Sequence, residues 1–348
     1  MNSRDDRLAA LVRRRRGSVA SPRGLAYVKD FRDASAWRPA LIEAQVPGLD
    51  LLSWVSDHLD QVRELLADRG AVSLRGMSTT TEAFGAVVAV VAGESLIDYV
   101  NRSTPRTRVL GQVFTSTEYS PARAIPMHSE QSYTCSWPLI LGFWCVEAAS
   151  TGGGTPLAST AQVLAALPSA LVGRFDRHGV MYERWYRQHL GISWQETFQT
   201  DSVAAVDEIC AEMGITSEWH DGNVLRTTQI AQATVAYPPT GQRVWFNQAN
   251  LFHVAALQAA VAQELEQAVG GRMPRSARFG DGRPIASADI EAIEEAFRAA
   301  NWCSPWRDGD VLLVDNIAVA HGREAFGGSR RVLVAMAGRG GEPAKGAS

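Results

Sequence analysis

Apolar residues recur along the chain with two spacings, one typical of helices and one typical of strands. Over residues 53–70 they recur about every 3.6 residues and the run ends on Gly70, which predicts an amphipathic helix. The segment 161–175 has a similar spacing, and Pro168 predicts a helix start or break inside it. Further helices are predicted over residues 81–93, 203–214 and 288–301.

Short runs rich in β-branched and aromatic residues predict strands elsewhere in the chain. They cover residues 71–77, 109–120, 139–148, 309–322 and 330–338. Because these strands do not alternate regularly with helices, as they would in βαβ units, the pattern favours a mainly β core with flanking helices.

The domain organisation predicted by the sequence is simple. No internal repeat and no linker long enough to separate domains is visible, so we expect one domain over residues 1–348. Residues 1–50 are polar and without a clear period, which predicts an irregular N-terminal arm. Residues 341–348 are expected to form a disordered tail. The oligomeric state is left open.

Charge and composition narrow the classes of partner. The formal net charge of −3 offers no broad basic surface, so nucleic acid is not an expected partner. The arginine run Arg13–Arg16 is expected to be a solvated part of the N-terminal arm. No apolar stretch of about 18 residues follows it, so neither a membrane span nor a secretory signal is expected. The four cysteines form no C-x-x-C pair, which is typical of reduced thiols in a cytoplasmic protein.

The stretch IPMHSEQSYT holds a histidine and a glutamate two positions apart, His128 and Glu130, at the end of a predicted strand. In a strand, residues i and i+2 point to the same side, so both side chains can reach one ion. The chain has a second match to H-x-[DE], His58 and Asp60, on the predicted helix over 53–70. In a helix the two side chains diverge by about 200°, so this second pair is not expected to bind a metal.

A third possible ligand is His321, near the end of a predicted strand and followed by glycine. Two histidines and one carboxylate form the facial triad of non-haem Fe(II) oxygenases. The same side chains can also bind zinc in a hydrolase. An arginine, Arg330 or Arg331, and the hydroxyl of Thr155 would suit a buried dicarboxylate co-substrate, which a zinc hydrolase does not use. The pattern therefore favours an iron site.

Together these stretches resemble the TauD/TfdA superfamily of Fe(II)- and 2-oxoglutarate-dependent oxygenases. The resemblance extends from about residue 98 to 338 and includes FTSTEY, IPMHSEQSYT, GGGTPLAS, VWFNQANLFHV and WRDGDVLLVDNIAVAHGREAF. The chain is most similar to the SyrP-like branch found with nonribosomal peptide biosynthesis, and more distantly to clavaminate synthase. The implied fold is a double-stranded β-helix, or jelly roll, with flanking helices.

The resemblance also implies a role for each candidate residue. Fe(II) would be the metal, with 2-oxoglutarate and O2 as co-substrates. Thr155 and one of the two arginines would bind 2-oxoglutarate. The turn Gly328–Arg330 matches a G-x-R turn of the branch and favours Arg330 over Arg331, since neighbours on a strand face opposite ways. The implied iron ligands are His128, Glu130 and His321.

Other residues near these motifs bear on the substrate. Arg323, two residues after the second histidine, could pair with a substrate carboxylate or form a structural ion pair. Ser129 and Gln131 stand where the branch more often has asparagine and methionine, which leaves the choice of substrate open. Trp302 and Trp306 are expected to be packing residues of the core or its rim.

The activity implied by the resemblance is hydroxylation of an unactivated C–H bond of an amino acid in natural-product biosynthesis. The amino acid could be free or carried as an aminoacyl unit on a carrier protein. The same site could instead desaturate, cyclise or epimerise its substrate. Halogenation is disfavoured, because halogenases lack the carboxylate ligand and Glu130 is present. A zinc-dependent hydrolase and a non-catalytic binding module remain as alternatives of other classes.

Overall fold

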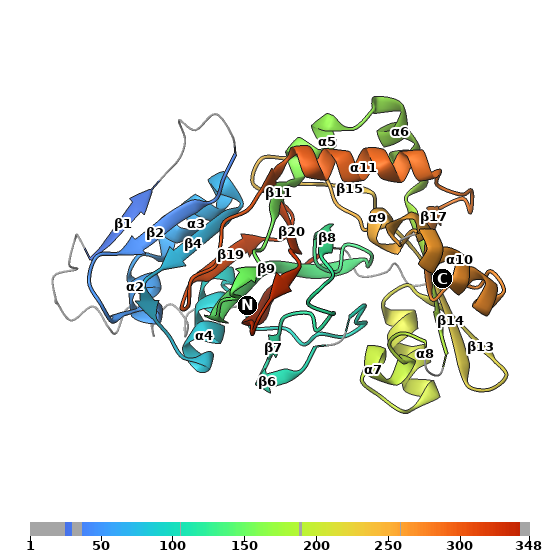
Figure 1. Cartoon of the computed structure of the whole chain (residues 1–348), viewed down its shortest axis with the longest axis horizontal. Helices are drawn as coiled ribbons and strands as arrows, with labels where there is room; N and C mark the ends of the chain where they lie inside the picture. Colours follow the sequence, from blue (N-terminus) through green and yellow to red (C-terminus); the bar gives the residue numbers. More distant parts are fainter. Residues whose placement is uncertain (1–24, 30–36, 105, 188–189, 258, 342–348) are drawn as a thin grey trace, which may run out of the picture.

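The computed structural model of the protein describes residues 25–29, 37–104, 106–187, 190–257 and 259–341. Its largest part is an eight-stranded sheet with the order β1-β2-β4-β19-β9-β22-β7-β6 (Figure 1). Strands β2 and β4 pair in parallel, whereas the other neighbours are antiparallel. The strands are β1 (Ala26–Lys29), β2 (Ala40–Ala44), β4 (Ala71–Arg75), β6 (Arg108–Leu110), β7 (Val113–Thr115), β9 (Ser136–Glu147), β19 (Val311–Asp315) and β22 (Arg331–Gly341).

A four-stranded sheet with the order β18-β11-β20-β8 packs against the inner face of the large sheet. Side chains from both sheets, among them Phe143, Leu157 and Val319, form one buried apolar cluster. Burying one face of each sheet against the other is the ordinary way to stabilise two β layers. The strands of the small sheet are β8 (Ile125–His128), β11 (Leu157–Ser159), β18 (Asn301–Trp302) and β20 (Val319–Arg323).

Three helices cover the outer face of the large sheet (Figure 1). They are α2 (Leu51–Asp57), α3 (Leu59–Arg69) and α4 (Thr81–Ala92). Helix α4 begins where the Thr80 side chain accepts a hydrogen bond of 3.2 Å from a backbone amide of the first turn. It ends at Gly93, whose φ of 73° is in the left-handed region that favours glycine. Gly142 of β9 lets α4 approach the sheet, because a Cβ there would overlap Val88 and lie 3.1 Å from the Phe84 ring.

Replacing Gly142 by alanine is therefore expected to destabilise the protein. Overpacking of this kind costs about 1–3 kcal/mol in the free energy of unfolding. The matched control is Gly173→Ala, because Gly173 is an exposed residue of a helix and nothing lies within 4 Å of a Cβ placed there. That control should gain about 0.5–1 kcal/mol from the better helix propensity of alanine. Urea denaturation measures both changes, and equal effects of the two substitutions would contradict the packing described for α4.

The remaining elements lie beside the core, around a second four-stranded sheet with the order β13-β14-β12-β17 (Figure 1). Helices α5, α6 and α11 share one apolar cluster with β12 and β17, and α7 and α8 share another with β14. The strands are β12 (Val180–Tyr186), β13 (Thr216–His220), β14 (Val224–Ala231) and β17 (Arg275–Phe279). The helices are α5 (Thr160–Ala166), α6 (Ser169–His178), α7 (Trp194–Phe198), α8 (Val203–Glu212), α9 (Ala249–Phe252), η1 (Val254–Ala256), α10 (Ala259–Val269) and α11 (Ser287–Ala299). Three two-stranded sheets join β3 (Leu49–Asp50) to β5 (Met77–Ser78), β10 (Thr151–Gly152) to β21 (Phe326–Gly327), and β15 (Thr234–Ala236) to β16 (Arg243–Trp245).

The predicted β core with flanking helices is confirmed, but several local predictions were wrong. The segment 1–50 is not irregular throughout, because β1 and β2 extend the large sheet within it. The helix predicted over 53–70 is interrupted at His58, which ends α2 and precedes α3. The strand predicted over 309–322 is divided between the two core sheets, with a turn at 316–318. Arg13–Arg16 and most of the predicted tail lie outside the described residues, whereas Gly341 belongs to β22.

The four cysteines are buried or partly buried. All four cysteines lie among the described residues, and each is a free thiol. Burial raises the pKa of Cys145, Cys210 and Cys303 to about 12, so these thiols stay protonated near neutral pH. Among the helices in the described part of the chain, none is both long and apolar enough to cross a membrane.

Candidate active site

Three potential metal ligands meet on the inner side of the small sheet. His128 ends β8 and lies directly opposite His321 of β20, with ring centroids 4.7 Å apart. Glu130 follows in the turn after β8. All three side chains are buried, and one ligand atom from each lies within 4.8 Å of the others. No other group of histidine, cysteine or acidic side chains in the described ranges is arranged in this way.

The position of Glu130 differs from the sequence prediction, because the strand ends at His128 and Glu130 reaches the site from a turn. Asn316, fully buried in the turn between β19 and β20, holds this turn in place. Its Oδ1 accepts from the Glu130 amide at 2.7 Å, and its Nδ2 donates to the Glu130 carbonyl at 2.9 Å. Asn316 was not a candidate residue in the sequence, since its partner is 186 positions away.

The carboxylate of Glu130 is held by two further buried side chains. The Tyr99 hydroxyl donates to Oε1 at 3.1 Å, and Arg106 Nη2 forms an ion pair with Oε2. Burial alone would raise the pKa of Glu130, but the charge of Arg106 lowers it to about 2. Glu130 is therefore ionised at neutral pH, as a metal ligand must be. Neither Tyr99 nor Arg106 was a candidate residue in the sequence.

The two histidines are in the protonation state that a metal site needs. Burial lowers the pKa of His128, and lowers that of His321 well below its usual value, so both rings are neutral. His128 Nδ1 donates to the carbonyl of Pro126 at 2.8 Å, which leaves Nε2 available to a metal. His321 Nδ1 is buried without a partner in the protein. Two neutral imidazoles and one carboxylate are suitable ligands for a divalent iron ion. The buried Nδ1 of His321, which has no partner in the protein, agrees with such a site.

A small cavity continues from the two histidines toward Thr155 and Arg330. Arg330 immediately precedes β22. Its Nε donates to the Gly153 carbonyl at 2.9 Å, and its Nη1 donates to Ser116 Oγ at 3.3 Å. Burial lowers the pKa of Arg330 to about 10, so it remains a cation at neutral pH. Its neighbour Arg331 is exposed and does not line this cavity.

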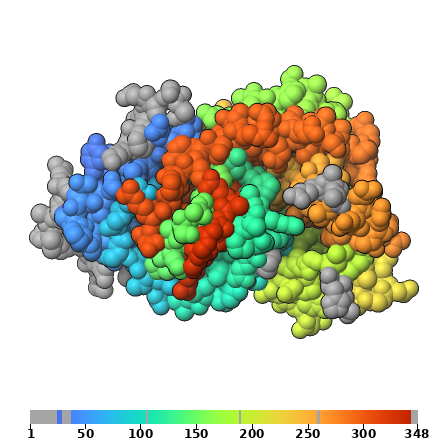
Figure 2. Space-filling model, viewed as in Figure 1, coloured from blue at the N-terminus to red at the C-terminus, as the bar shows by residue number. Residues whose placement is uncertain are grey.

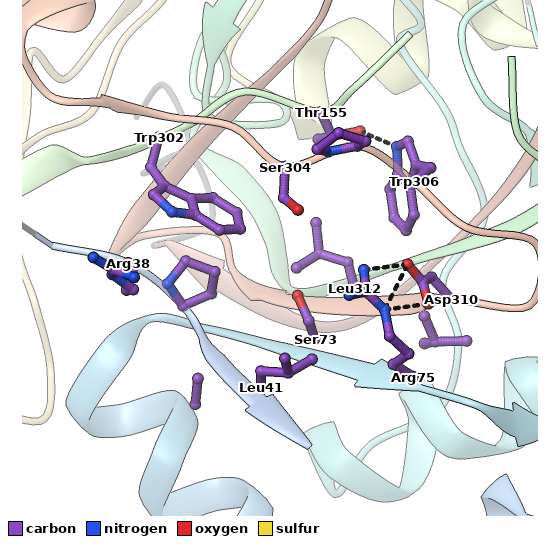
Figure 3. A pocket seen from close by; sticks show the side chains of 14 residues that line it. Arg38, Leu41, Ser73, Arg75, Thr155, Trp302, Ser304, Trp306, Asp310 and Leu312 are labelled. Atoms are coloured by element: carbon purple, nitrogen blue, oxygen red, sulfur yellow. Dashed lines mark hydrogen bonds and ion pairs between the residues drawn. The ribbon is translucent and has the colours of Figure 1, made fainter. Parts of the chain in front are cut away.

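The hydroxyl of Thr155 accepts a hydrogen bond from a tryptophan. Trp306 Nε1 donates to Thr155 Oγ1 at 3.0 Å, and Figure 3 shows this bond at the edge of a neighbouring cavity of about 200 Å³. Trp302 lines the same cavity without entering this bond (Figure 3). Because Trp306 occupies the oxygen as an acceptor, the hydroxyl proton of Thr155 is available to a ligand on the other side. Trp306 therefore does more than the packing predicted from the sequence.

The contacts of Arg323 argue against its predicted pairing with a substrate carboxylate. Its side chain is buried and donates four hydrogen bonds, of 2.7–3.2 Å, to backbone carbonyls of the segment 117–123. It forms no ion pair with any residue that the structure describes; instead, it holds the loop that precedes β8 in place. The sequence could not indicate this role, because the acceptors are backbone atoms about 200 positions away.

A large cavity of about 640 Å³ also borders the triad. His128, Glu130 and Arg106 line it, together with parts of the segments 184–196 and 251–275. In Figure 2 the surface is hollowed where the teal segment faces the yellow-green and orange segments. A volume of this size is within the range of pockets for small-molecule ligands, roughly 300–1,000 Å³.

Comparison with known proteins identifies the family. Residues 30–337 match the family described as "Taurine catabolism dioxygenase TauD, TfdA family". The dapdiamide synthesis protein DdaC of Enterobacter agglomerans is 36% identical over 299 residues, which are 85% of this chain and 90% of DdaC. A clavaminate synthase-like protein of Arabidopsis thaliana is 30% identical over 284 residues, with 78% and 82% of the two chains covered. The crystal structure of PvcB from Pseudomonas aeruginosa shares the fold with a TM-score of 0.53 at 16% identity, covering 92% of this chain and 93% of PvcB.

The fold and these matches define an Fe(II)- and 2-oxoglutarate-dependent oxygenase with a jelly-roll core. The chain belongs to the TauD/TfdA family. The resemblance found in the sequence is thereby confirmed, together with Fe(II) as the metal and 2-oxoglutarate and O2 as co-substrates. Family membership decides against the zinc hydrolase and the non-catalytic binding module.

Proposed function

We propose that His128, Glu130 and His321 bind the Fe(II) ion and that Thr155 and Arg330 bind the distal carboxylate of 2-oxoglutarate. The observation that carries this proposal is the pairing of the two histidines beside Glu130, at the junction of two cavities. The small cavity leads to a hydroxyl and a half-buried guanidinium, which together suit one carboxylate. The large cavity leaves room for a substrate next to the same ligands.

Iron, 2-oxoglutarate and O2 together supply the oxidising power, with 2-oxoglutarate ending as succinate and CO2 while one oxygen atom is available to the substrate. The protein contributes position and charge. The pair formed by Asn316 and the Glu130 backbone fixes one ligand, and the strand pairing fixes the other two. Arg330 neutralises the distal carboxylate, and Thr155 donates its hydroxyl proton to it.

We further propose that the substrate is an amino acid, free or carried on a carrier protein, and that the reaction is hydroxylation of an unactivated C–H bond. Two observations support this proposal. The cavity beside the triad exceeds the size of a single small amino acid, so it can also accept an extended aminoacyl arm. DdaC, which is similar over 85% of this chain, is named for dapdiamide synthesis, and this supports a biosynthetic role here as well.

Turnover with a panel of amino acids tests this substrate assignment. Each amino acid is offered free and as a thioester on carrier protein, with Fe(II), 2-oxoglutarate and isotopically labelled O2. We expect one substrate to gain one labelled oxygen atom in step with succinate. Loss of two hydrogens without oxygen would assign desaturation instead. Turnover confined to compounds other than amino acids would contradict the proposed substrate class.

Trp306→Phe is expected to weaken 2-oxoglutarate binding moderately. The substitution keeps an aromatic ring but removes the donor that orients the Thr155 hydroxyl. A single hydrogen bond contributes about 1 kcal/mol, so the KM for 2-oxoglutarate should rise about five-fold. Trp302→Phe is the matched control, because Trp302 lines the same cavity as Trp306. Equal KM values in the two variants would contradict the role given to Trp306.

A further inference from the structure

Two arginines on neighbouring strands of the second sheet line the large cavity. Arg184 of β12 and Arg275 of β17 are directly opposite each other in an antiparallel pair, so their side chains project from the same face of the sheet. Like charges in this position repel each other. Neither arginine forms an ion pair with an acidic residue in the described part of the chain. An anionic group bound beside them would therefore reduce the repulsion.

The two guanidinium groups differ in what they already bind. Arg184 is buried, and its Nη1 donates to Asn101 Oδ1 at 2.9 Å while its Nη2 donates to the Arg102 carbonyl. Arg275 is only half-buried, and its side chain makes no hydrogen bond to any residue that the structure describes. The donors of Arg275 are therefore accessible to a ligand, whereas two of those of Arg184 are occupied.

The charged end of Arg275 faces the metal ligands. Its guanidinium carbon lies 5.6 Å from the centre of the Phe252 ring, and Phe252 lines the same cavity. Burial is the main reason for the low pKa of His128, but the positive charges of Arg106 and Arg275 lower it further. Because this effect comes from the guanidinium and falls with distance, the charge of Arg275 lies within electrostatic reach of the triad. Arg275 does not line the small cavity, so its donors serve the substrate side.

The wall of the large cavity carries excess positive charge. Arg106 and Glu130 pair with each other, and Glu196 already accepts hydrogen bonds from the amide and the hydroxyl of Ser193. Other parts of the wall are apolar, including Leu251 and Leu257. A ligand that complements both parts would carry an anionic group and an apolar or extended remainder. Among the described residues, the charged side chains that line the cavity are four arginines and two glutamates: Arg106, Arg123, Arg184, Arg275, Glu130 and Glu196.

We infer that Arg275 binds a carboxylate group of the substrate in the large cavity. This inference rests on the proposed function and names the group by which the substrate is recognised. It gives Arg275 the role considered in the sequence for Arg323, whose guanidinium is occupied by backbone carbonyls. The carboxylate can be the α-carboxylate of a free amino acid or an acidic side chain of a tethered one.

Matched pairs of probes, one acidic and one neutral, test the inference by binding rather than turnover. The pairs are free amino acids with their α-amides, and aspartate with asparagine and glutamate with glutamine, each free and as a pantetheine thioester. Protein loaded anaerobically with Fe(II) and 2-oxoglutarate has a visible charge-transfer band, and its shift reports binding beside the metal. We expect the acidic member of at least one pair to bind about ten- to a hundred-fold more tightly. Pairs that differ at the α-carboxylate and pairs that differ at the side chain distinguish the two sources.

Arg275→Gln should remove most of this preference by weakening the acidic member and leaving the affinity of the neutral member unchanged. Arg275→Lys keeps the charge without the planar fork of donors and should retain part of the preference. Two controls should retain all of it. Arg278→Gln makes the same change on the same strand, but Arg278 is exposed and points to the opposite face. Arg123→Gln removes an exposed arginine from the wall of the same cavity.

Several results would overturn the inference. They are the absence of any acidic preference in the wild type, an undiminished preference in Arg275→Gln, and an equal loss of preference in Arg123→Gln. Loss of the band in both Arg275 variants would also overturn it, because Arg275 would then support the metal site instead of the substrate. Failure of the proposed function is distinct, because the wild type itself would then form no band or oxidise no amino acid.

Discussion

His128→Ala and His321→Ala are each expected to abolish iron binding and all succinate formation. The two rings lie opposite each other on paired strands, so neither can be replaced by a neighbouring side chain. Either variant keeps only one of the two histidines together with Glu130. The Glu130 carboxylate also accepts hydrogen bonds from Tyr99 and Arg106, which compete with the metal for its oxygens. Iron content after anaerobic loading and succinate yield measure the effect.

The matched control for the histidine variants is His58→Ala. His58 belongs to the other H-x-[DE] pair, but its ring stacks on Trp54 with centroids 4.3 Å apart and its Nδ1 hydrogen-bonds the Trp54 carbonyl. This variant should keep its iron and its activity, with at most a modest loss of stability. Iron-dependent turnover in either His128→Ala or His321→Ala would show that the ligands have been assigned wrongly.

Arg330→Ala is expected to raise the KM for 2-oxoglutarate about ten- to a hundred-fold. A charge-assisted hydrogen bond to a carboxylate contributes about 1.5–3 kcal/mol, and Arg330 lines the small cavity whereas Arg331 does not. Arg331→Ala removes the same charge one position later, from an exposed side chain, and should change the KM little. Steady-state kinetics with varied 2-oxoglutarate compares the two, and thermal unfolding checks that both variants are folded. A larger effect of Arg331→Ala would contradict the assignment of Arg330, because the co-substrate would then bind on the side to which Arg331 points.

The elements that the sequence predicts well are those with a local cause. Helix α11 agrees closely with its periodic segment, and Thr80 and Gly93 give α4 recognisable ends. The candidate ligands His128 and His321 could also be recognised, because each lies at or near the end of a predicted strand within a recognisable motif, although the pairing of their strands was not predicted. In each of these cases the signal lies within a few residues of the feature.

The parts that the sequence does not predict depend on distant contacts. The chain between β19 and β20 contains no proline or glycine, so nothing local shows that it leaves one sheet for the other at Asn316. Arg106 and Glu130 are 24 positions apart, and the carbonyls that occupy Arg323 are about 200 positions away. An isolated arginine has no local pattern to distinguish a ligand-binding side chain from one that fastens a loop. The division of roles among Arg106, Arg323 and Arg330 therefore requires the fold.

The most direct test of the account is an anaerobic absorbance titration of 2-oxoglutarate into the protein loaded with Fe(II). Chelation of iron by the keto oxygen and near carboxylate gives a weak visible charge-transfer band. We predict that this band develops with one equivalent of 2-oxoglutarate in the wild type, is absent from His321→Ala, and requires a much higher co-substrate concentration in Arg330→Ala. A band of undiminished intensity in His321→Ala, or no band in the wild type, would contradict the proposed iron and 2-oxoglutarate site.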